Sequence, residues 1–415
     1  MSRTRSGLIA ALDVGSTKMC CFVARADDDG SIRVVGIGHQ MSRGVRNGAI
    51  VDMEAAETAI RNTVHAAEHM ADETIRQILV NISCGSPASS TVGVEVSIAG
   101  HEVGDSDVRR VLHQGLHHFE PAERNLLHMI PVGFSIDGCN GVRDPRGMFG
   151  ERLGVDMHVV TAGSSALRNL SATIGRCHLD IEGCVVAPYA AGLAALVPDE
   201  TDLGATIIDM GGGTTSIAVF YGGEVVFVDS VPIGGNHVTN DIARGLTTPL
   251  ADAERIKTLY GCAVPTPSDE REVIDVPQIG EEEHAHANHV PKSILVSIIQ
   301  PRLEETFELV RSRLEASGFD RLAGRRVVLT GGASQLQGVS DLAGLVLDKQ
   351  VRLGRPMRVN GIAEATGGPA FATCAGLLIY GVHKQPDAIV DRMPDPEPMP
   401  AGVFGRIGGW LRENF

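Results

Sequence analysis

The chain has 415 residues and a formal net charge of −15. That length can hold two or more domains with a sizeable core, and the acidic balance argues against a nucleic-acid binder because no basic stripe offsets it. Eight scattered cysteines without a CxxC pair argue against zinc or a disulfide framework and fit a reducing cytoplasm, and no segment reads as a signal core or a membrane span.

The first predicted element is a hairpin with its turn at residues 12–18 and a returning apolar run at 19–23. Asp13 follows an apolar strand, and Gly15 and two small hydroxyl residues precede Lys18. Glycine lets a turn adopt positive φ and brings backbone N–H groups close to an anion, while hydroxyl and ammonium groups add donors for phosphate oxygens. Taken alone, the pattern fits an ordinary hairpin turn equally well.

Residues 82–162 are predicted to form an inserted unit. It contains a strand-like stretch at 91–98, a helix that opens at Asp105 or Ser106, and an alternating strand at 155–161.

Residues 208–216 repeat the first hairpin, with Asp209 followed by glycines and threonines and then by an apolar run at 217–220. Chance rarely places the same polar set after the same apolar set twice, so the repeat favours two hairpins that close around one phosphate chain. A carboxylate at a strand end should not touch phosphate, because like charges repel. Asp13 and Asp209 are therefore predicted to hold Mg²⁺, through water.

Two helix-forming stretches rich in small residues, 188–196 and 369–378, also resemble each other, and small side chains let two helices cross at close range. An ordinary tightly packed Ala-rich helix explains either copy alone. A short strand at 327–329 ends in Thr-Gly-Gly and is predicted to open a helix, where backbone can approach a nucleobase or phosphate.

A longer helix is predicted to start at Pro291 and to stop at Gly318, with a break or kink at Pro301. Its apolar residues recur at helical spacing, so one face should be buried.

The composition changes near the C-terminus. Residues 385–401 carry five prolines and several acids, which predicts an extended linker. Beyond it, apolar residues at helical spacing form one stripe that suits the headgroup boundary of an anionic membrane. These residues are Val403, Phe404, Ile407, Trp410, Leu411 and Phe415. Docking of this segment on the body of the protein is the alternative.

Two hairpins, two small-residue helices and a Thr-Gly-Gly strand end, in this order along the chain, resemble the five elements of the actin-like ATPase superfamily. The insert, above all residues 142–153, is similar to the extra subdomain of the FtsA family of bacterial cell-division proteins. Residues 231–243 and 253–257, outside the insert, also resemble segments of that family. The resemblance implies an α/β, actin-like ATPase fold of two lobes, each with a duplicated mixed-sheet core, plus an inserted FtsA-type subdomain.

The family layout implies boundaries for each part of this chain. The first-lobe core takes 1–81 (1A), 163–199 and 361–384, the insert (1C) takes 82–162, the second-lobe core takes 200–240 (2A) and 326–360, the outer subdomain (2B) takes 241–325, the linker takes 385–401, and an amphipathic membrane-targeting helix takes 402–415.

The resemblance also implies a site for ATP and Mg²⁺ between the lobes. Phosphates would be held by Gly15, Ser16, Thr17 and Lys18 from one side and by Gly211, Gly212, Gly213, Thr214 and Thr215 from the other, with Gly234 and Gly235 approaching them. Asp13 and Asp209 would orient the hydrated metal. Adenosine would lie beside Gly331, Gly332 and Gln335, with Glu254 and Lys257 near the ribose and base.

No residue is a compelling general base for hydrolysis. Asp209, or a water held by Thr215, is a weak candidate, so slow hydrolysis is expected. By resemblance, the helical region after Pro291 would receive the C-terminal peptide of the tubulin-like protein FtsZ, and Arg302 is a plausible contact for its acidic part. A surface arginine with no partner role is an equally good interpretation.

The implied function is to polymerise, to anchor FtsZ filaments to the cytoplasmic face of the inner membrane at the division septum, and to help recruit later membrane proteins of the divisome. A pilus-assembly relative and a soluble phosphotransferase on the same fold are the alternatives. The insert and the terminal stripe argue against a soluble kinase, and the lack of a substrate-binding domain argues against a DnaK-type chaperone.

Overall fold

The computed structural model describes residues 6–117, 123–280 and 288–383. The predicted linker at 385–401 and the predicted terminal helix at 402–415 lie outside these residues. Within the described part of the chain, no helix is both long and apolar enough to cross a membrane.

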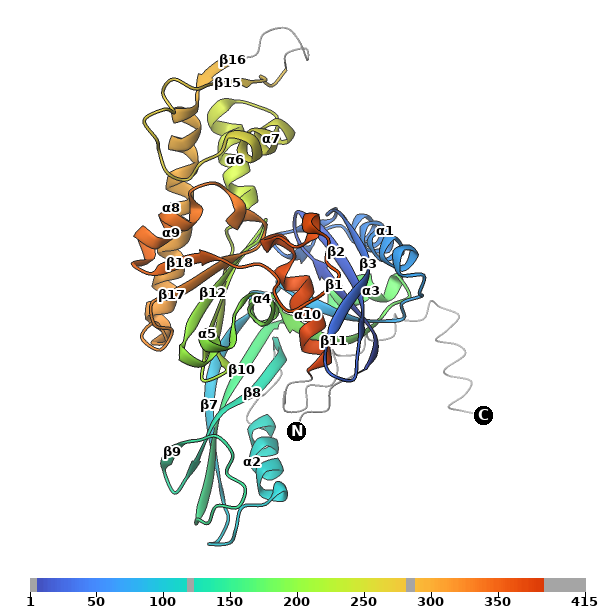
Figure 1. Ribbon diagram of the computed structural model, residues 1–415, viewed down its shortest axis with the longest axis vertical. Coiled ribbons are helices and arrows are strands. Elements are labelled where there is room, and N and C mark those ends of the chain that lie inside the picture. Colours follow the sequence, from blue (N-terminus) through green and yellow to red (C-terminus); the bar gives the residue numbers. More distant parts are fainter. Residues whose placement is uncertain (1–5, 118–122, 281–287, 384–415) are drawn as a thin grey trace, which may run out of the picture.

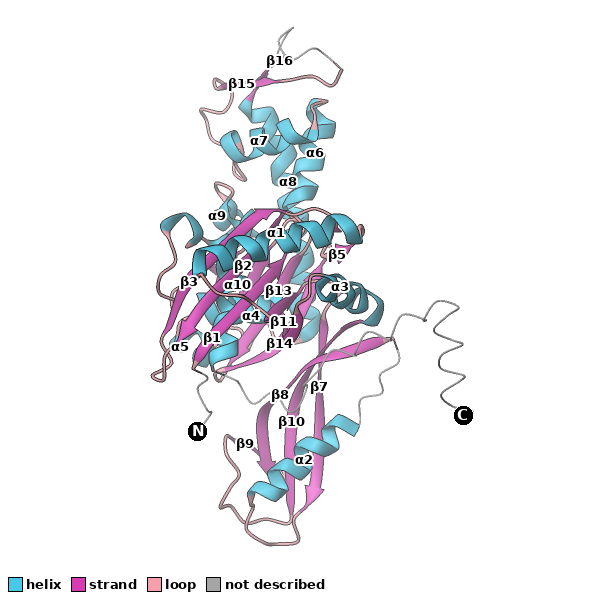
Figure 2. Ribbon diagram, turned by 90° about the vertical axis from the view of Figure 1, so that its right-hand side faces the viewer, coloured by secondary structure: helices cyan, strands magenta, loops and turns pink. Residues whose placement is uncertain are grey.

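The first lobe is built on a five-stranded mixed sheet with the order β11-β6-β1-β2-β3. Its strands are β1 (Gly7–Val14), β2 (Lys18–Ala26), β3 (Ile32–Met41), β6 (Gln77–Ile82) and β11 (Asp180–Val186). The strands β1, β2 and β3 are antiparallel, and β6 and β11 add parallel strands beside β1. Helices α1 (Met53–Ala71) and α3 (Ser164–Arg176) lie on one face of this sheet (Figure 2).

The second lobe repeats this topology strand for strand. Its sheet has the order β14-β13-β12-β17-β18. The strands are β12 (Ala205–Met210), β13 (Thr215–Tyr221), β14 (Glu224–Val231), β17 (Arg326–Thr330) and β18 (Gln350–Leu353). Again three antiparallel strands are followed by two parallel ones, so that β12 corresponds to β1 and β17 to β6. The predicted duplication of a mixed-sheet core is therefore confirmed.

Two helices join the lobes, α4 (Ala187–Ala195) and α10 (Ala372–Val382), the latter preceded by the 3₁₀ turn η3 (Pro369–Phe371). They cross so closely that a Cβ added to Gly376 would lie 1.7 Å from the carbonyl oxygen of Ala190. Glycine in a helix costs about 1 kcal/mol relative to alanine. At Gly376 this cost is offset by the close contact of α10 with the backbone of α4. The close crossing predicted from small residues is thus present.

The insert is a separate antiparallel sheet with one helix against it, and it projects from the base of the two lobes (Figure 1). The sheet order is β7-β10-β8-β9. Its elements are β7 (Ala88–Ser97), α2 (Asp105–His117), β8 (Arg124–Ile136), β9 (Cys139–Val142) and β10 (Arg152–Gly163). A core of its own, with Val111, Leu153 and Met157 among its members, holds these elements together.

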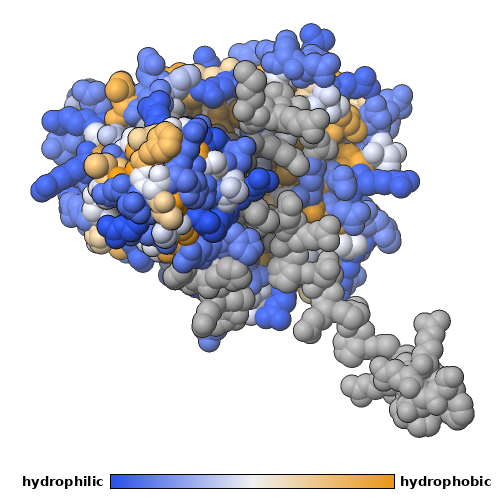
Figure 3. Space-filling model, turned by 90° about the horizontal axis from the view of Figure 1, so that it is seen from below, coloured by the Kyte–Doolittle hydropathy of each residue, from blue (hydrophilic) through white to orange (hydrophobic). Residues whose placement is uncertain are grey.

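The insert contacts both lobes. In the first lobe, the backbone N–H of Val186 donates to Nε2 of the buried His128 at 3.0 Å. In the second lobe, the Ser89 hydroxyl donates to the carbonyl oxygen of Val228 at 3.0 Å and accepts from the N–H of the same residue at 2.7 Å. One hydroxyl therefore satisfies the free edge of β14 at this residue. Seen from the insert's end, the surface is mostly hydrophilic with scattered hydrophobic residues (Figure 3).

The outer subdomain of the second lobe is mainly helical. It contains α6 (Gly235–Leu246), α7 (Leu250–Tyr260), the strand pair β15 (Val273–Val276) and β16 (Asn288–Pro291), and α8 (Lys292–Ser317). Helix α8 ends at Ser317, and Gly318, where the stop was predicted, caps it with a left-handed φ of 76°.

Of the break or kink predicted at Pro301, the break is wrong, and the kink stays a prediction. Helix α8 runs through Pro301 as one element, although proline inside a helix costs about 3 kcal/mol. Buried side chains on both sides of it, including Ile299, Leu303 and Phe307, pack into the core of the second lobe. Packing on this scale offsets the missing backbone hydrogen bond.

The helix predicted directly after the Thr-Gly-Gly strand end is present as one short 3₁₀ turn and not as an α-helix. Only the 3₁₀ turn η1 (Gly332–Gln335) follows β17, and α9 (Val339–Leu347) begins later. Leu336 is extended and Gly338 has a φ of 76°, so the chain leaves the helical conformation between the two elements. Before them, Gly331 has a φ of 84° at the strand end.

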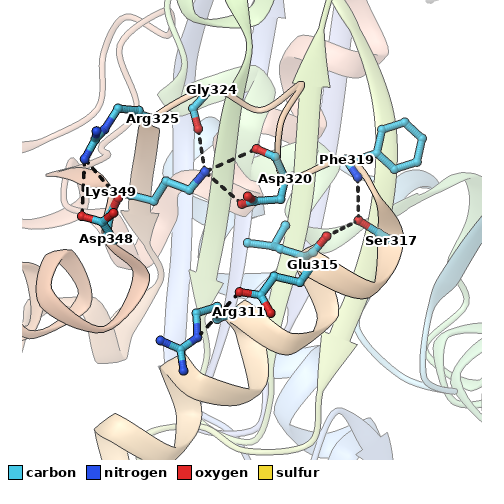
Figure 4. Close-up of polar contacts among 10 residues, drawn as sticks. Arg311, Glu315, Ser317, Phe319, Asp320, Gly324, Arg325, Asp348 and Lys349 are labelled. Carbon is cyan, nitrogen blue, oxygen red and sulfur yellow. Dashed lines mark hydrogen bonds and ion pairs between the residues drawn. The ribbon is translucent and has the colours of Figure 1, made fainter.

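Polar contacts fix the end of α8 to the far edge of the second sheet (Figure 4). The ammonium of Lys349 donates to the carbonyl oxygen of Gly324 at 2.7 Å and lies 2.9 Å from the Asp320 carboxylate. Arg325 lies 3.4 Å from Asp348 nearby, in a more exposed pair. Exposed pairs of this kind contribute little to stability, so Lys349, which is only 13% exposed, is the residue that orders this turn.

We expect Gly376→Ala to lower the free energy of unfolding by about 1–3 kcal/mol, because the new methyl group forces α10 away from α4. The matched control is Gly175→Ala in α3, where an added Cβ meets no atom within 4 Å. The control should be neutral or stabilising by up to about 1 kcal/mol, since alanine is the better helix former. Thermal and urea unfolding measure both changes, and equal effects of the two substitutions would contradict the close-crossing argument.

Candidate functional site

The two predicted hairpin turns have the same backbone geometry. Between β1 and β2, the N–H of Gly15 donates to the carbonyl oxygen of Lys18 at 3.1 Å, and between β12 and β13 the N–H of Gly211 donates to that of Thr214 at 2.9 Å. A Cβ added at Gly15 would lie 2.6 Å from the Lys18 oxygen, so glycine is required for that turn to close. Each turn follows the strand that carries an aspartate, Asp13 in β1 or Asp209 in β12.

The two turns touch each other across the lobes. The Thr17 hydroxyl donates to Oδ1 of Asn236 at 3.0 Å, which joins the first turn to the start of α6. A Cβ added to Gly212 would lie 2.0 Å from Oγ1 of Thr17, and one added to Gly213 would lie 2.7 Å from Oγ of Ser16. Glycine in the second turn is therefore what allows the lobes to meet here.

A cavity of about 150 Å³ lies between the strand ends and has both aspartates in its wall. Each carboxylate keeps some surface open to this cavity and is otherwise enclosed by protein. Burial raises the pKa of Asp13 to about 7, the charge of Lys18 opposes that rise, and the charge of Asp209 adds to it. Burial also raises the pKa of Asp209. Two contacts oppose this rise: the Thr373 hydroxyl donates to Asp209 Oδ2 at 3.1 Å, and the charge of Lys18 lies nearby.

Lys18 is held at the entrance of α10. Its ammonium donates to the carbonyl oxygen of Ala370 at 2.5 Å and lies 3.3 Å from the centroid of the Phe371 ring. A cation over an aromatic face within about 6 Å is attracted by the ring quadrupole. Lys18 therefore joins the first hairpin to the second connecting helix, close to both carboxylates.

A second cavity, of about 420 Å³, lies between the second-lobe core and the outer subdomain. Thr17, Gly212 and Gly332 line both cavities, so the contact between the turns stands where the cavities adjoin. On its far wall the ammonium of Lys257 lies 2.7 Å from Glu254 Oε2 and donates to the Thr239 hydroxyl at 2.8 Å. This network holds two charged side chains of opposite sign at the rim of a pocket of ligand size.

Most of the predicted cofactor residues line one of the two cavities. The first is lined by Asp13, Gly15, Ser16, Thr17, Lys18, Asp209, Gly211, Gly212, Gly213, Thr214, Gly331 and Gly332. The second adds Gly235, Glu254, Lys257 and Gln335. The structure thus gathers, from both lobes, residues that are more than 300 positions apart in the sequence.

Two predicted residues lie in neither cavity wall. Thr215 is fully buried, and its hydroxyl donates to the carbonyl oxygen of Ile233 at 2.8 Å, which is a packing contact and gives no support to a role in holding water. Gly234 lies against the second turn, where a Cβ would be 2.5 Å from the Gly211 oxygen.

Arg302 lies on α8, and its guanidinium contacts the carboxylates of Asp241 and Glu305. The predicted membrane-facing residues of the tail are outside the described residues.

Several residues of the site were missed from the sequence. Asn81, at the end of β6, accepts a hydrogen bond from the N–H of Val14 at 2.7 Å and lines the first cavity. Because β6 is parallel to β1, a polar residue at its carboxyl end reaches the same edge as Asp13, and this signal was readable. Ser83, Ser216 and Thr373 also line the first cavity, and Asn236 lines the second.

Two family models match this chain, one from the second lobe into α10 and one over the insert. The family model described as "Cell division protein FtsA" matches residues 206–376, and "SHS2 domain inserted in FTSA" matches residues 85–161. Curated proteins named cell division protein FtsA are similar over nearly their whole length. The one from Rhizobium meliloti (strain 1021) is 46% identical over 99% of this chain and 96% of its own, and the one from Escherichia coli (strain K12) is 31% identical over 98% of each.

Solved structures share the fold at low sequence identity. A chain of the PilM-PilN type IV pilus biogenesis complex has a TM-score of 0.64 and 18% identity, and covers 91% of this chain and 99% of its own. MreB5 of Spiroplasma citri bound to ADP has a TM-score of 0.52 and 15% identity, and covers 90% of this chain and 95% of its own. These likenesses, with the inserted domain, confirm the predicted actin-like ATPase fold.

The pKa of Asp13 predicts a pH-dependent stability of the ligand-free protein. With a pKa of about 7 in the folded protein against about 3.9 in an unfolded chain, Asp13 binds a proton in the folded state that the unfolded state has lost. Its contribution to stability is therefore complete below the unfolded pKa and is lost as the pH rises through about 7. Asp13→Asn removes this loss, so the melting temperature of the variant in EDTA should exceed that of wild type by a margin that grows from about pH 4 to about pH 7 and stays level above it.

The control for this measurement is Asp28→Asn in the exposed turn between β2 and β3, which should follow wild type at each pH. An Asp13→Asn variant whose advantage does not change with pH would show that desolvation of this carboxylate is not the cause.

Proposed function

We propose a function for this chain from its family, because the chain belongs to the FtsA family of cell division proteins. In this proposal it is an actin-like ATP-binding protein that polymerises and that anchors FtsZ filaments to the cytoplasmic membrane. It would act on the cytoplasmic face of the inner membrane at the division septum and help to recruit later divisome membrane proteins. The observation that carries the nucleotide part is the pair of glycine turns that meet in front of two enclosed aspartates. The pilus-assembly and phosphotransferase alternatives have no comparable support, since the likeness to PilM extends to the fold alone.

The residues of both cavities fit a nucleoside triphosphate with Mg²⁺. Backbone N–H groups of glycine turns and the hydroxyls of Ser16 and Thr214 suit phosphate oxygens, and Lys18 supplies a cation. Two carboxylates whose burial raises their pKa are stabilised by a nearby divalent cation, which favours Asp13 and Asp209 as holders of hydrated Mg²⁺. The second cavity, of about 420 Å³, has the size for the adenosine part beside Gln335 and Lys257.

The contact between the turns makes nucleotide binding and lobe position interdependent. Gly212 and Thr17 leave no room for phosphate oxygens between them, so a phosphate chain would lie in the cavity that both turns line, and any ligand that entered between the turns would have to move one lobe relative to the other. Mg²⁺ would supply charge neutralisation of the phosphates. The protein's own groups would bind and orient the phosphate chain from both lobes, and that binding would favour the relative position of the lobes in which both sets of groups contact the ligand.

Hydrolysis is expected to be slow. Both candidates for activating water are weak, because Asp209 accepts a hydrogen bond from Thr373, and Thr215 lies in neither cavity wall and donates to the carbonyl oxygen of Ile233. A turnover of many per second in the purified protein would contradict this expectation.

For partner binding, the outer subdomain is proposed to receive the FtsZ C-terminal peptide. Arg302 would contact its acidic part only in competition with Asp241 and Glu305, which already neutralise it. The proposal therefore expects this contact to be sensitive to salt and modest in strength.

The nucleotide proposal predicts that Gly212→Ala weakens binding of Mg²⁺-ATP by at least about tenfold, since its methyl group collides with Thr17 and changes the approach of the two turns. Isothermal titration measures the dissociation constant. The control is Gly133→Ala in the insert, where an added Cβ meets no atom within 4 Å, and it should bind as wild type does. No binding of ATP to wild type, with or without Mg²⁺, would refute the proposed site.

The membrane proposal rests on the apolar stripe of the tail. One short helix with Arg406 and Arg412 should bind anionic vesicles weakly, whereas several copies on one filament bind tightly through effective concentration. In co-sedimentation with anionic liposomes and purified FtsZ, Trp410→Glu should lose most of the FtsZ that wild type brings down, and Trp410→Phe should retain it. Equal recovery of FtsZ with wild type and Trp410→Glu would exclude the tether.

A further inference from the structure

A small hairpin beside the first turn belongs to the site although neither of its strands lines a cavity. It consists of β4 (Val45–Arg46) and β5 (Ala49–Ile50), joined by Asn47 and Gly48. Asn47 has a φ of 48° and Gly48 a φ of 76°, the left-handed pair that a two-residue turn of this kind demands. Figure 2 shows β5 near α1 and α3 of the first lobe.

One hydrogen bond joins this hairpin to the first phosphate turn, in which the backbone N–H of Gly48 donates to Oγ of Ser16 at 2.8 Å. Before the hairpin, at the end of β3, the N–H of Ser42 donates to the carbonyl oxygen of Thr17 at 2.8 Å, so the segment that leads into the hairpin is also held against this turn. The hairpin therefore follows the position of residues 16 and 17, which face the cavity.

The same turn also contacts the second lobe and the entrance to the insert. A Cβ added to Gly213 would lie 2.6 Å from Cα of Asn47, so the turn rests against the opposite phosphate hairpin. A Cβ added to Gly48 would lie 2.6 Å from the carbonyl oxygen of Ser83, which leads into the insert. Contacts on three sides fix the turn in place before any ligand arrives.

The bond from Gly48 determines what the Ser16 hydroxyl can do. A serine hydroxyl has one proton and two acceptor lone pairs. Gly48 occupies an acceptor position, which leaves the proton of Ser16 available for an anion in the cavity that Ser16 lines. A hydroxyl that accepts one hydrogen bond also becomes a better donor in the next, because the bonds polarise each other.

We propose that the Asn47–Gly48 turn is a positioning element of the nucleotide site, which orients the Ser16 hydroxyl as a donor to the phosphate chain. This rests on the proposed nucleotide function. Gly48 acts through Ser16 and does not itself touch the ligand. Because the turn also rests on Gly213 and Ser83, a phosphate chain that draws Ser16 toward it pulls on contacts with the second lobe and with the insert.

The test displaces the turn and asks whether the effect passes through Ser16. Asn47→Val places a β-branched residue where φ is 48°, a conformation that such residues avoid. Asn47→Gly removes the same side chain and permits that conformation, so it serves as the rescue variant. Binding of ATP, ADP and adenosine is measured by isothermal titration for wild type, Asn47→Val, Asn47→Gly, Ser16→Ala and the double variant Ser16→Ala/Asn47→Val.

We expect Ser16→Ala to weaken ATP binding about tenfold, as the loss of a hydrogen bond to a charged group requires. Asn47→Val should weaken it about threefold to tenfold, and Asn47→Gly should restore most of the loss. The double variant should bind no more weakly than Ser16→Ala alone, and adenosine should bind all variants alike because it has no phosphate.

Three results would overturn the inference: unchanged ATP binding in Asn47→Val, an effect of Asn47→Val that multiplies that of Ser16→Ala, or an equal loss for adenosine. In each of these the wild type still binds ATP, so the proposed function stands. Failure of the wild type to bind any nucleotide overturns both.

Discussion

The contact between two glycine turns, one from each lobe, is the constraint on which the site depends. Gly212 and Gly213 have no side chains, and for that reason Ser16 and Thr17 can reach the second turn and Asn236. The same device recurs at the base of the lobes, where Gly376 lets α10 lie against the backbone of α4. Side chains at either place would hold the duplicated sheets apart. At both contacts a glycine backbone packs directly against the other lobe or helix, so the strand ends of the two lobes can face each other.

That geometry creates an electrostatic cost. The strand ends carry Asp13 and Asp209, and enclosing them raises the pKa of both against the pull of Lys18. Lys18 relieves part of the cost, yet it is shared with the carbonyl oxygen of Ala370 and the ring of Phe371. A fold optimised for stability alone would not keep two adjacent carboxylates there. Their retention in one cavity with glycine turns is the strongest physical indication of a ligand that brings positive charge.

The sequence predicts the hairpins well because their signals are local. An apolar run, a glycine and hydroxyl residues determine a turn whatever surrounds it, and the repeat at Asp209 doubles the signal. Pro301 and Gln335 show the limit of this reasoning. A break at Pro301 was predicted from the local cost of proline in a helix, but the burial of Leu303 and Phe307 keeps α8 continuous. The 3₁₀ turn that starts at Gly332 ends at Gln335, and the next residue, Leu336, is extended. Asn81 carries a readable signal only once β6 is placed parallel to β1, because its partner Val14 is distant in the sequence.

The position of the insert follows from these contacts. In sequence it interrupts the first lobe, and His128 ties it there through Val186. In space, Ser89 also bonds both backbone groups of Val228 in the second lobe. A rigid unit bonded to two bodies cannot stay fixed to both when they move relative to each other. A ligand that shifted one lobe would therefore either break the Ser89 bonds and leave the insert with the first lobe, or break the His128 bond and carry the insert with the second lobe.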